Sequence, residues 1–226
     1  RESQDGYARS SYERAQGAQA SGRMAQEIVP VSVPQRKGDP RVVDTDEEPG
    51  RANFEKFPKL RPAFQKDGTV TPANASTIND GAAALVLTTA DHAFEIGAAP
   101  RARLIAQASF AQAPDWFTTA PVGAVRSALE RADLTVDDID LFEINEAFSV
   151  VALACAQELG IDRDKLNVDG GAVALGHPIG ASGARILVTL LHALEARDLR
   201  RGCAAICLGG GEATAVIIER EPSSAI

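Results

Sequence analysis

The second half of the chain alternates strand-like and helix-like segments, and this alternation constrains the fold more than any other feature of the sequence. Runs rich in apolar and β-branched residues indicate four strands: "ARLIAQASFA" (102–111), "IDLFEI" (139–144), "GCAAICL" (202–208) and "EATAVIIER" (212–220). The longer segments between them have the pattern of helices, at 121–135, at 147–160 and in the later part of 167–199. Strands that alternate with helices predict a layered α/β core.

The first ninety residues or so are less regular. Residues 5–22 are rich in Ala and Gln and predict a helix, and the valine pattern of 27–34 predicts a strand. Residues 35–62 are polar, charged and interrupted by prolines, which indicates a long surface loop. Residues 68–89 are expected to lead from a loop, through small residues, into a further strand.

Composition argues against several classes of protein. The 226 residues carry a net charge of −8 and form no basic stripe, so nucleic-acid binding is not expected. No segment approaches the roughly 18–20 apolar residues of a membrane span, and the first residues do not resemble a signal peptide. Three cysteines in a chain of this length favour a reducing compartment. Since "EPSSAI" at the C-terminus is not a peroxisomal address, a cytoplasmic location is expected.

The spacing of the cysteines does not indicate a disulfide or a metal site. Cys203 and Cys207 are four residues apart in a predicted strand, which is about 13 Å at roughly 3.3 Å per residue. A disulfide needs Cα atoms about 4.4–6.8 Å apart. The spacing is also not the Cys-x-x-Cys of zinc or thioredoxin-like sites, so no metal is expected.

Asn145, in "EINEAF" (143–148), lies where a predicted strand changes into a helix. One interpretation is an N-cap, in which the side-chain oxygen accepts a backbone N–H of the next turn. The other is a ligand-facing polar group at the C-terminal edge of a sheet, where α/β proteins bind their ligands. Taken alone, the residue fits either role.

His177 lies in the small-residue stretch "GGAVALGHPIGASGAR" (170–185), between Gly176 and Pro178. The backbone is tightly specified there, and the ring has room to face a cleft. Ser182 and nearby glycines lead into a helix, whose N-terminus favours negative charge. A packing turn is the alternative, but a functional role is favoured because histidine titrates near neutral pH.

Cys207 ends a predicted strand just before Gly209, Gly210 and Gly211. Glycines there let backbone N–H groups approach a developing oxyanion with no side chain in the way. A thiol near a histidine can act as a base or a nucleophile. Cys155 and Cys203, by contrast, fit the ordinary role of a free cysteine as a small buried apolar residue.

Four stretches together resemble the thiolase family, in the family's order and over about residues 1–220: "NASTINDGAAA" (74–84), "NEAF" (145–148), "GGAVALGHPIGASGAR" (170–185) and "CLGGGEA" (207–213). The resemblance implies a thiolase-like layered αβαβα architecture, of which this chain has the C-terminal half and the end of the loop domain. It also implies reversible Claisen condensation of two acyl-CoA thioesters, a reaction of fatty-acid metabolism such as β-oxidation. Coenzyme A and acyl-CoA would be substrates, with no covalently bound cofactor.

The resemblance implies a catalytic role for four residues. Cys207 would be the general base and acid that takes the α-proton of acetyl-CoA in synthesis. His177 would activate the nucleophilic cysteine and line an oxyanion hole. Asn145 would hold a water that binds the enolate oxygen together with His177. The backbone N–H of Gly209 would contribute to a second oxyanion hole.

The resemblance also implies four substrate-binding residues. Ser76 matches the serine beside the pantetheine arm of CoA, and Ala147 and Phe148 would line the same tunnel. Phe117, in "DWFTTAPVG", would lie near the acyl pocket.

The chain departs from the thiolase pattern because it lacks the nucleophilic cysteine, which the family carries in its N-terminal half in a Cys-x-Ser-Gly-like setting. Neither Cys155 nor Cys203 fits that motif, and the chain does not begin with Met. We therefore expect three parts: the end of the loop (CoA-binding) domain (1–78), the last strand and helix of the N-terminal domain (79–100) and the C-terminal domain (101–226). The expected partner is an N-terminal half, as a separate chain or a cleaved fragment, in a homodimer or homotetramer.

Two alternatives to an active thiolase half follow from the same motifs. A non-catalytic thiolase-like chain would bind acyl-CoA without turnover, but a degenerate copy is expected to lose His177 or Cys207, and both are present. A ketoacyl synthase shares the fold but uses two histidines or a His–Asn pair. The "CLGGG" of the last strand region argues against it.

Overall fold

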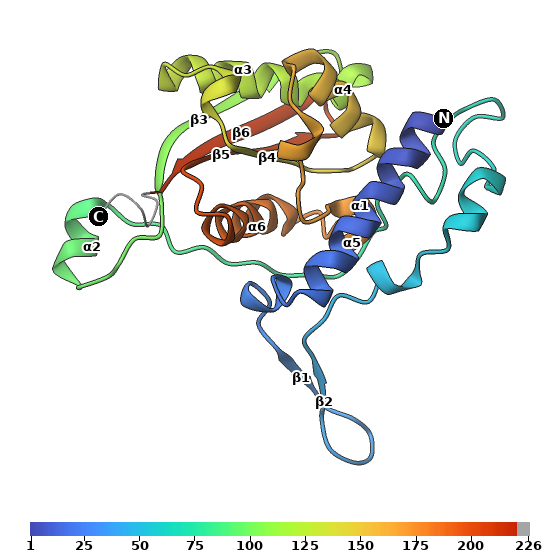
Figure 1. The fold of residues 1–226 in the computed structure, drawn as a ribbon, viewed down its shortest axis with the longest axis horizontal. Coiled ribbons are helices and arrows are strands. Elements are labelled where there is room, and N and C mark those ends of the chain that lie inside the picture. Colours follow the sequence, from blue (N-terminus) through green and yellow to red (C-terminus); the bar gives the residue numbers. More distant parts are fainter. Residues whose placement is uncertain (221–226) are drawn as a thin grey trace.

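The computed structural model describes residues 1–220, whose centre is a four-stranded mixed sheet with helices on both faces (Figure 1). The strand order is β3-β6-β5-β4. β6 pairs antiparallel with both β3 and β5, and β4 runs parallel to β5. All four strands predicted in the second half are present: β3 (Arg103–Ala111), β4 (Leu141–Ile144), β5 (Arg201–Leu208) and β6 (Glu212–Glu219).

Helices cover the sheet in two layers. α3 contacts β3 and β6 and lies with α4 on one face, whereas α6 contacts β4 and β5 from the other (Figure 1). The helices are α1 (Glu2–Ala20), α2 (Ala90–Glu95), α3 (Ala120–Ala132), α4 (Ser149–Leu159), α5 (Ala172–Leu175) and α6 (Ser182–Ala196). Short 3-10 turns are η1 (Met24–Gln26), η2 (Pro49–Arg51), η3 (Phe54–Lys59), η4 (Pro114–Thr119), η5 (Val136–Asp138) and η6 (Arg163–Lys165). Within residues 1–220, every helix falls short of the length and apolarity that a membrane crossing requires.

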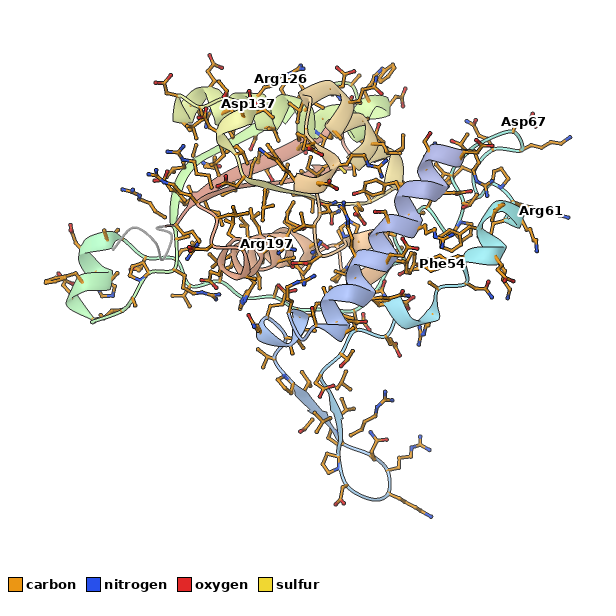
Figure 2. The ribbon with its side chains drawn as sticks, in the orientation of Figure 1. Phe54, Arg61, Asp67, Arg126, Asp137 and Arg197 are labelled. Carbon is orange, nitrogen blue, oxygen red and sulfur yellow. The ribbon has the colours of Figure 1, made fainter. Side chains whose placement is uncertain are left out.

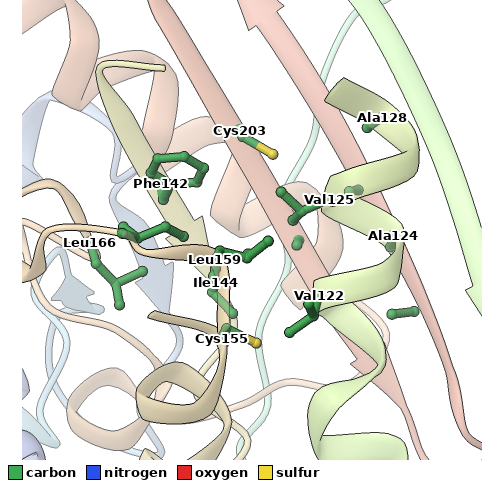
Figure 3. Packing of buried hydrophobic residues seen from close by; sticks show 14 of the residues in the cluster. Val122, Ala124, Val125, Ala128, Phe142, Ile144, Cys155, Leu159, Leu166 and Cys203 are labelled. Carbon is green, nitrogen blue, oxygen red and sulfur yellow. The ribbon is translucent and has the colours of Figure 1, made fainter. Parts of the chain in front are cut away.

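The main core lies between the sheet and the layer of α3 and α4 (Figure 3). Phe142 from β4 and Val125 from α3 are fully buried there, and each such side chain stabilises the fold by about 1.5–3 kcal/mol. Cys155 from α4 and Cys203 from β5 are buried and free, as the sequence predicted. Gly123 lets α3 come close to β3, because a Cβ at this position would overlap the ring of Phe110.

Helix α1 closes one side of the molecule and packs against α5 and α4 (Figure 1). Tyr12 on α1 makes edge-to-face contacts with Phe54 and Phe57 of η3, and Figure 2 labels Phe54 beside the helix. The helix predicted at 5–22 is confirmed as α1. Its aromatic contacts anchor part of the polar segment that follows.

The polar segment contains a hairpin that the sequence did not predict. The strand expected over 27–34 is shorter, as β1 (Val31–Val33), and it pairs antiparallel with β2 (Arg41–Val43) inside the predicted loop 35–62. The hairpin projects from the body of the molecule (Figure 1). Its valines are exposed, so the hairpin lacks the buried face that gives most strands a recognisable apolar pattern in the sequence.

The strand predicted at the end of 68–89 is wrong, and with it the strand expected within 79–100. Residues 81–89 form no secondary structure before α2, and Val86 and Leu87 are 96% and 77% exposed. A strand requires a neighbour to take up its backbone hydrogen bonds, and no strand among residues 1–220 pairs with this segment. Of the two elements predicted for 79–100, the structure has only the helix, and the division into three domains stays a prediction.

Candidate active site

Asn145 and Cys207 lie at the same end of the sheet, because β4 and β5 are neighbouring parallel strands. Asn145 directly follows β4, and Cys207 is the second-last residue of β5. Ile144, the last residue of β4, is in register with Ala205 of β5, and the Asn145 N–H donates to the Ala205 carbonyl at 2.9 Å. Cys207 is two residues further along β5. The N-cap interpretation of Asn145 is wrong, since Phe148 occupies the N-cap of α4 and its side chain makes no capping bond.

His177 contacts Asn145 from the loop between α5 and α6. Its Nε2 lies 3.3 Å from Nδ2 of Asn145, and its Nδ1 lies 2.6 Å from Oγ of Ser182. Burial, and secondarily the charge of Arg185, hold the pKa of His177 below its usual value. The ring is therefore neutral at physiological pH, the state required of a general base.

Residues 74–79 hold the Asn145 and His177 loops together. The backbone N–H and Oγ of Ser76 both donate to the Ala147 carbonyl, at 3.1 and 3.0 Å. One residue later, the Thr77 carbonyl accepts the N–H of His177 at 2.8 Å. Gly176 has a φ of +90°, and a Cβ there would overlap the side chain of Asn79. A glycine is thus required directly before the histidine.

Three phenylalanines form an aromatic cluster beside these loops. Phe148 makes edge-to-face contacts with Phe117 at 6.3 Å and with Phe64 at 6.0 Å between ring centroids. The structure thus brings together two residues that the sequence singled out and one that it missed. Phe64 is 73% exposed and stands alone in a polar stretch, so no periodic pattern marked it.

Cys207 is a partly buried free thiol that packs against the same core as Phe148. Burial raises the pKa of the Cys207 thiol, so it is protonated at neutral pH. The glycines after it differ in their roles. Gly211 has a φ of +92° and a Cβ there would collide with the backbone at Gln112, whereas the space beside Gly209 is open. Gly211 therefore makes the turn, and Gly209 leaves its backbone approachable.

Glu146 is a fully buried carboxylate that sequence reasoning missed. Its Oε1 accepts hydrogen bonds from the Tyr7 hydroxyl at 2.8 Å and from Nδ2 of Asn167 at 2.9 Å. Its Oε2 accepts from Oγ of Ser11 at 2.7 Å and from the backbone N–H of Val173 at 3.0 Å. Three of these bonds tie Glu146 to α1 and α5, and the fourth ties it to Asn167 in the loop before α5. Among residues 1–220 no group of three or more His, Cys, Asp or Glu is placed to hold a metal ion.

Two family models account for almost the whole chain. Residues 1–91 match the thiolase N-terminal domain, and residues 98–220 match the thiolase C-terminal domain. The chain belongs to the thiolase family. The layered α/β fold expected of a thiolase is likewise confirmed by solved thiolase structures. An acetyl-CoA acetyltransferase from Bacillus anthracis superposes with a TM-score of 0.93 at 44% identity over 97% of this chain. The Acat5 thiolase from Ascaris suum, solved in complex with coenzyme A, gives 0.88 at 46% identity, also over 97%.

Curated relatives show the same likeness in sequence. A probable acetyl-CoA acetyltransferase of Dictyostelium discoideum is 53% identical over 220 residues, and an acetyl-CoA acetyltransferase of Schizosaccharomyces pombe is 50% identical over 221. Each match covers 97% of this chain but only 53% and 56% of the relative. The two solved structures above are likewise covered over 56% of their length. This thiolase chain therefore spans about half the length of the relatives it matches.

Proposed function

We propose that this chain supplies the proton-transfer and oxyanion-binding part of an acyl-CoA C-acyltransferase. The reaction condenses acetyl-CoA with an acyl-CoA, or cleaves a 3-ketoacyl-CoA with CoA. The observation that carries the proposal is the pairing of His177 with Asn145 at the sheet edge where β5 reaches Cys207. The names of the relatives, acetyl-CoA acetyltransferases, support the class of reaction.

In the first half-reaction His177 acts as the base. Nε2 takes the proton of a nucleophilic cysteine thiol, and the thiolate attacks the thioester carbonyl. The C–S bond to CoA breaks, and the departing CoA sulfur takes the proton of Cys207. The acyl group is then held as a thioester on the enzyme, which gives ping-pong kinetics.

In the second half-reaction the Cys207 thiolate removes the α-proton of acetyl-CoA. The enolate carbon attacks the acyl-enzyme carbonyl, a C–C bond forms and the nucleophilic cysteine leaves as a thiolate. Because burial raises the pKa of Cys207, its thiolate is a stronger base than an exposed one. Asn145 and His177 stabilise the enolate oxygen, and loss of one such donor costs about 10²–10³ in rate.

The nucleophile is proposed to come from an N-terminal half that pairs with this chain. Ile78, Val86 and Leu87 are 86%, 96% and 77% exposed, and such an apolar segment is unfavourable in water. An N-terminal half would cover it. A homodimeric or homotetrameric assembly and a cytoplasmic location belong to the same proposal.

Thiolysis of acetoacetyl-CoA tests the proposal. The complete protein is expected to cleave it, the His177→Ala variant to lose most of that rate, and residues 1–226 alone to have none. Turnover by residues 1–226 alone would contradict the need for a second half. A complete protein that binds CoA but gives no product would favour the non-catalytic alternative.

A further inference from the structure

His177 stands in the middle of a short chain of hydrogen-bonding groups. On one side its Nε2 faces Nδ2 of Asn145 at 3.3 Å. On the other its Nδ1 lies 2.6 Å from Oγ of Ser182, whose hydroxyl lies 3.1 Å from the Pro178 carbonyl oxygen and donates to it. Ser182 is buried and is the first residue of α6, so its hydroxyl has little freedom to find water instead.

With the Asn145 amide oriented as in the structure, counting hydrogens along this chain gives the state of the imidazole. The Asn145 amide nitrogen has hydrogens but no lone pair to offer, so the Nε2 that faces it must accept. In a neutral imidazole the hydrogen is then on Nδ1, and Ser182 accepts it. The one hydroxyl hydrogen of Ser182 is left for the Pro178 carbonyl, as the geometry shows.

We propose that Ser182 is a positioning residue that holds His177 with its hydrogen on Nδ1, so that Nε2 is bare on the side of Asn145. The tautomer is a statement about this chain alone. Its catalytic consequence rests on the proposed function, because a bare Nε2 is what allows His177 to take a thiol proton.

The hydrogen bond from Nδ1 to Ser182 also stabilises the protonated ring. Once Nε2 has gained a proton, Nδ1 still donates to Ser182, and the bond becomes stronger because the donor is now charged. Ser182 therefore favours the imidazolium, whereas Arg185, on the same helix, disfavours it by its charge. The other elements around the ring contribute uncharged groups, the Asn145 amide and the Thr77 carbonyl that accepts the His177 N–H. Arg185 and burial lower the basicity of His177, and the hydrogen bond to Ser182 offsets part of that decrease.

The direct test is magic-angle-spinning NMR of the complete protein labelled with ¹³C,¹⁵N-histidine, a method without a size limit. His177→Asn identifies the His177 signals by their disappearance. The expected result is a neutral ring protonated at Nδ1 in the wild type. In Ser182→Ala a mixture of both tautomers is expected, because the Asn145 amide can then turn its Oδ1, which has no hydrogen-bond partner among residues 1–220, toward an Nε2–H. A wild-type ring protonated at Nε2, or a Ser182→Ala ring unchanged from the wild type, would overturn the proposal.

Kinetics add a second readout. Ser182→Ala is expected to lower kcat about 10- to 100-fold, the usual effect of losing one hydrogen bond to a charged group, with little change in KM. It is also expected to move the acidic limb of the kcat/KM profile to lower pH. Ser182→Thr keeps the hydroxyl and should restore the wild-type limb. A lowered rate with no shift of the limb in Ser182→Ala would mean that the serine only supports the fold.

Ser149→Ala is the matched control. Ser149 is also buried and also the first residue of a helix, α4, but its Oγ has no hydrogen-bond partner among residues 1–220. The Ser149→Ala substitution should leave both the tautomer of His177 and the pH profile unchanged. Because the NMR measurement needs no turnover, an inactive wild type with its hydrogen on Nδ1 would refute the proposed function and leave the role of Ser182 intact.

Discussion

Substitution of Glu146 is expected to destabilise the protein more than any other single change near the site. The carboxylate is fully buried and accepts four hydrogen bonds between 2.7 and 3.0 Å, from Tyr7, Ser11, Asn167 and the Val173 N–H. Glu146→Ala removes the acceptor of the Tyr7 hydroxyl, the Ser11 hydroxyl and the Val173 N–H. The amide nitrogen of Asn167 keeps two partners, the Ile144 carbonyl and the Tyr7 hydroxyl. An unsatisfied buried donor costs about 1–3 kcal/mol, so three of them are expected to cost about 3–9 kcal/mol.

Glu146→Gln tests the same reasoning with a smaller change. The amide keeps the volume and one accepting oxygen. If its nitrogen replaces Oε2, the hydroxyl of Ser11 can turn and accept, but the Val173 N–H cannot and is left unpaired. The expected loss is then about 1–3 kcal/mol, the cost of one unsatisfied buried donor.

Equilibrium unfolding in urea measures both losses, provided that the slope m is the same for all variants. Glu158→Gln is the control, because Glu158 is exposed on α4, and it should stay within about 0.5 kcal/mol of the wild type. A Glu146→Gln variant as stable as that control would refute the argument that the buried network holds these loops in place.

Two further predictions concern pH. Burial raises the pKa of Tyr7 well above its ordinary value, and the charge of Glu146 adds to the effect. The folded protein therefore binds the hydroxyl proton of Tyr7 more tightly than the unfolded chain does. The free energy of unfolding should fall as the pH rises above about 10. Absorbance titration should show Tyr7 ionising only on unfolding, and a Tyr7→Phe difference spectrum that reveals a tyrosinate in the folded protein near pH 10 would contradict this. Burial also raises the pKa of Glu27 to about 7, so its contribution to stability is full below about pH 4.5 and lost as the pH rises through about 7. Glu27→Gln, which can still accept from Thr189, should therefore be more stable than the wild type by about 3 kcal/mol at pH 8. Thermal unfolding at pH 5 and 8 would show no such difference if Glu27 were exposed.

The sequence predicted the second half of the fold well because the elements there have their neighbours within the chain. β3, β4, β5 and β6 pair with one another, and the apolar residues of β4, β5 and β6 are mostly buried. β3 lies at the edge of the sheet and is mostly exposed, but it still pairs with β6. Residues 81–89 have the same apolar character, but no strand among residues 1–220 pairs with them, and propensity alone did not make them a strand. The hairpin of β1 and β2 shows the converse, since it pairs without any buried face.

Some residues of the site could be predicted from the sequence and others could not, again because of where their partners lie. Asn145 could be found because it stands where a predicted strand changes into a helix, and His177 because it stands in a stretch of small residues. Glu146 belongs to the same motif as Asn145, but its partners Tyr7 and Ser11 lie 139 and 135 residues away, and no local pattern shows such contacts.

The roles of two glycines in the stretch 170–185 are visible only in the structure. Gly170 and Gly171 appeared in the sequence as part of a loop around His177. In the structure a Cβ at Gly170 would collide with Ser11 and Ala15 of α1, and one at Gly171 with the carboxylate of Glu146. Their lack of a side chain therefore serves the packing of α1 and the buried network, not a ligand.

The most direct test of the central claim is the fate of the acyl group in Cys207→Ala, measured on the complete protein. Incubation with acetyl-CoA, followed by intact-mass analysis, should show an acetylated enzyme, because the nucleophile and His177 remain and the departing CoA thiolate can take its proton from water. Acetoacetyl-CoA should not form, because no base is left to take the α-proton. Condensation at the wild-type rate in this variant would contradict the role that we assign to Cys207.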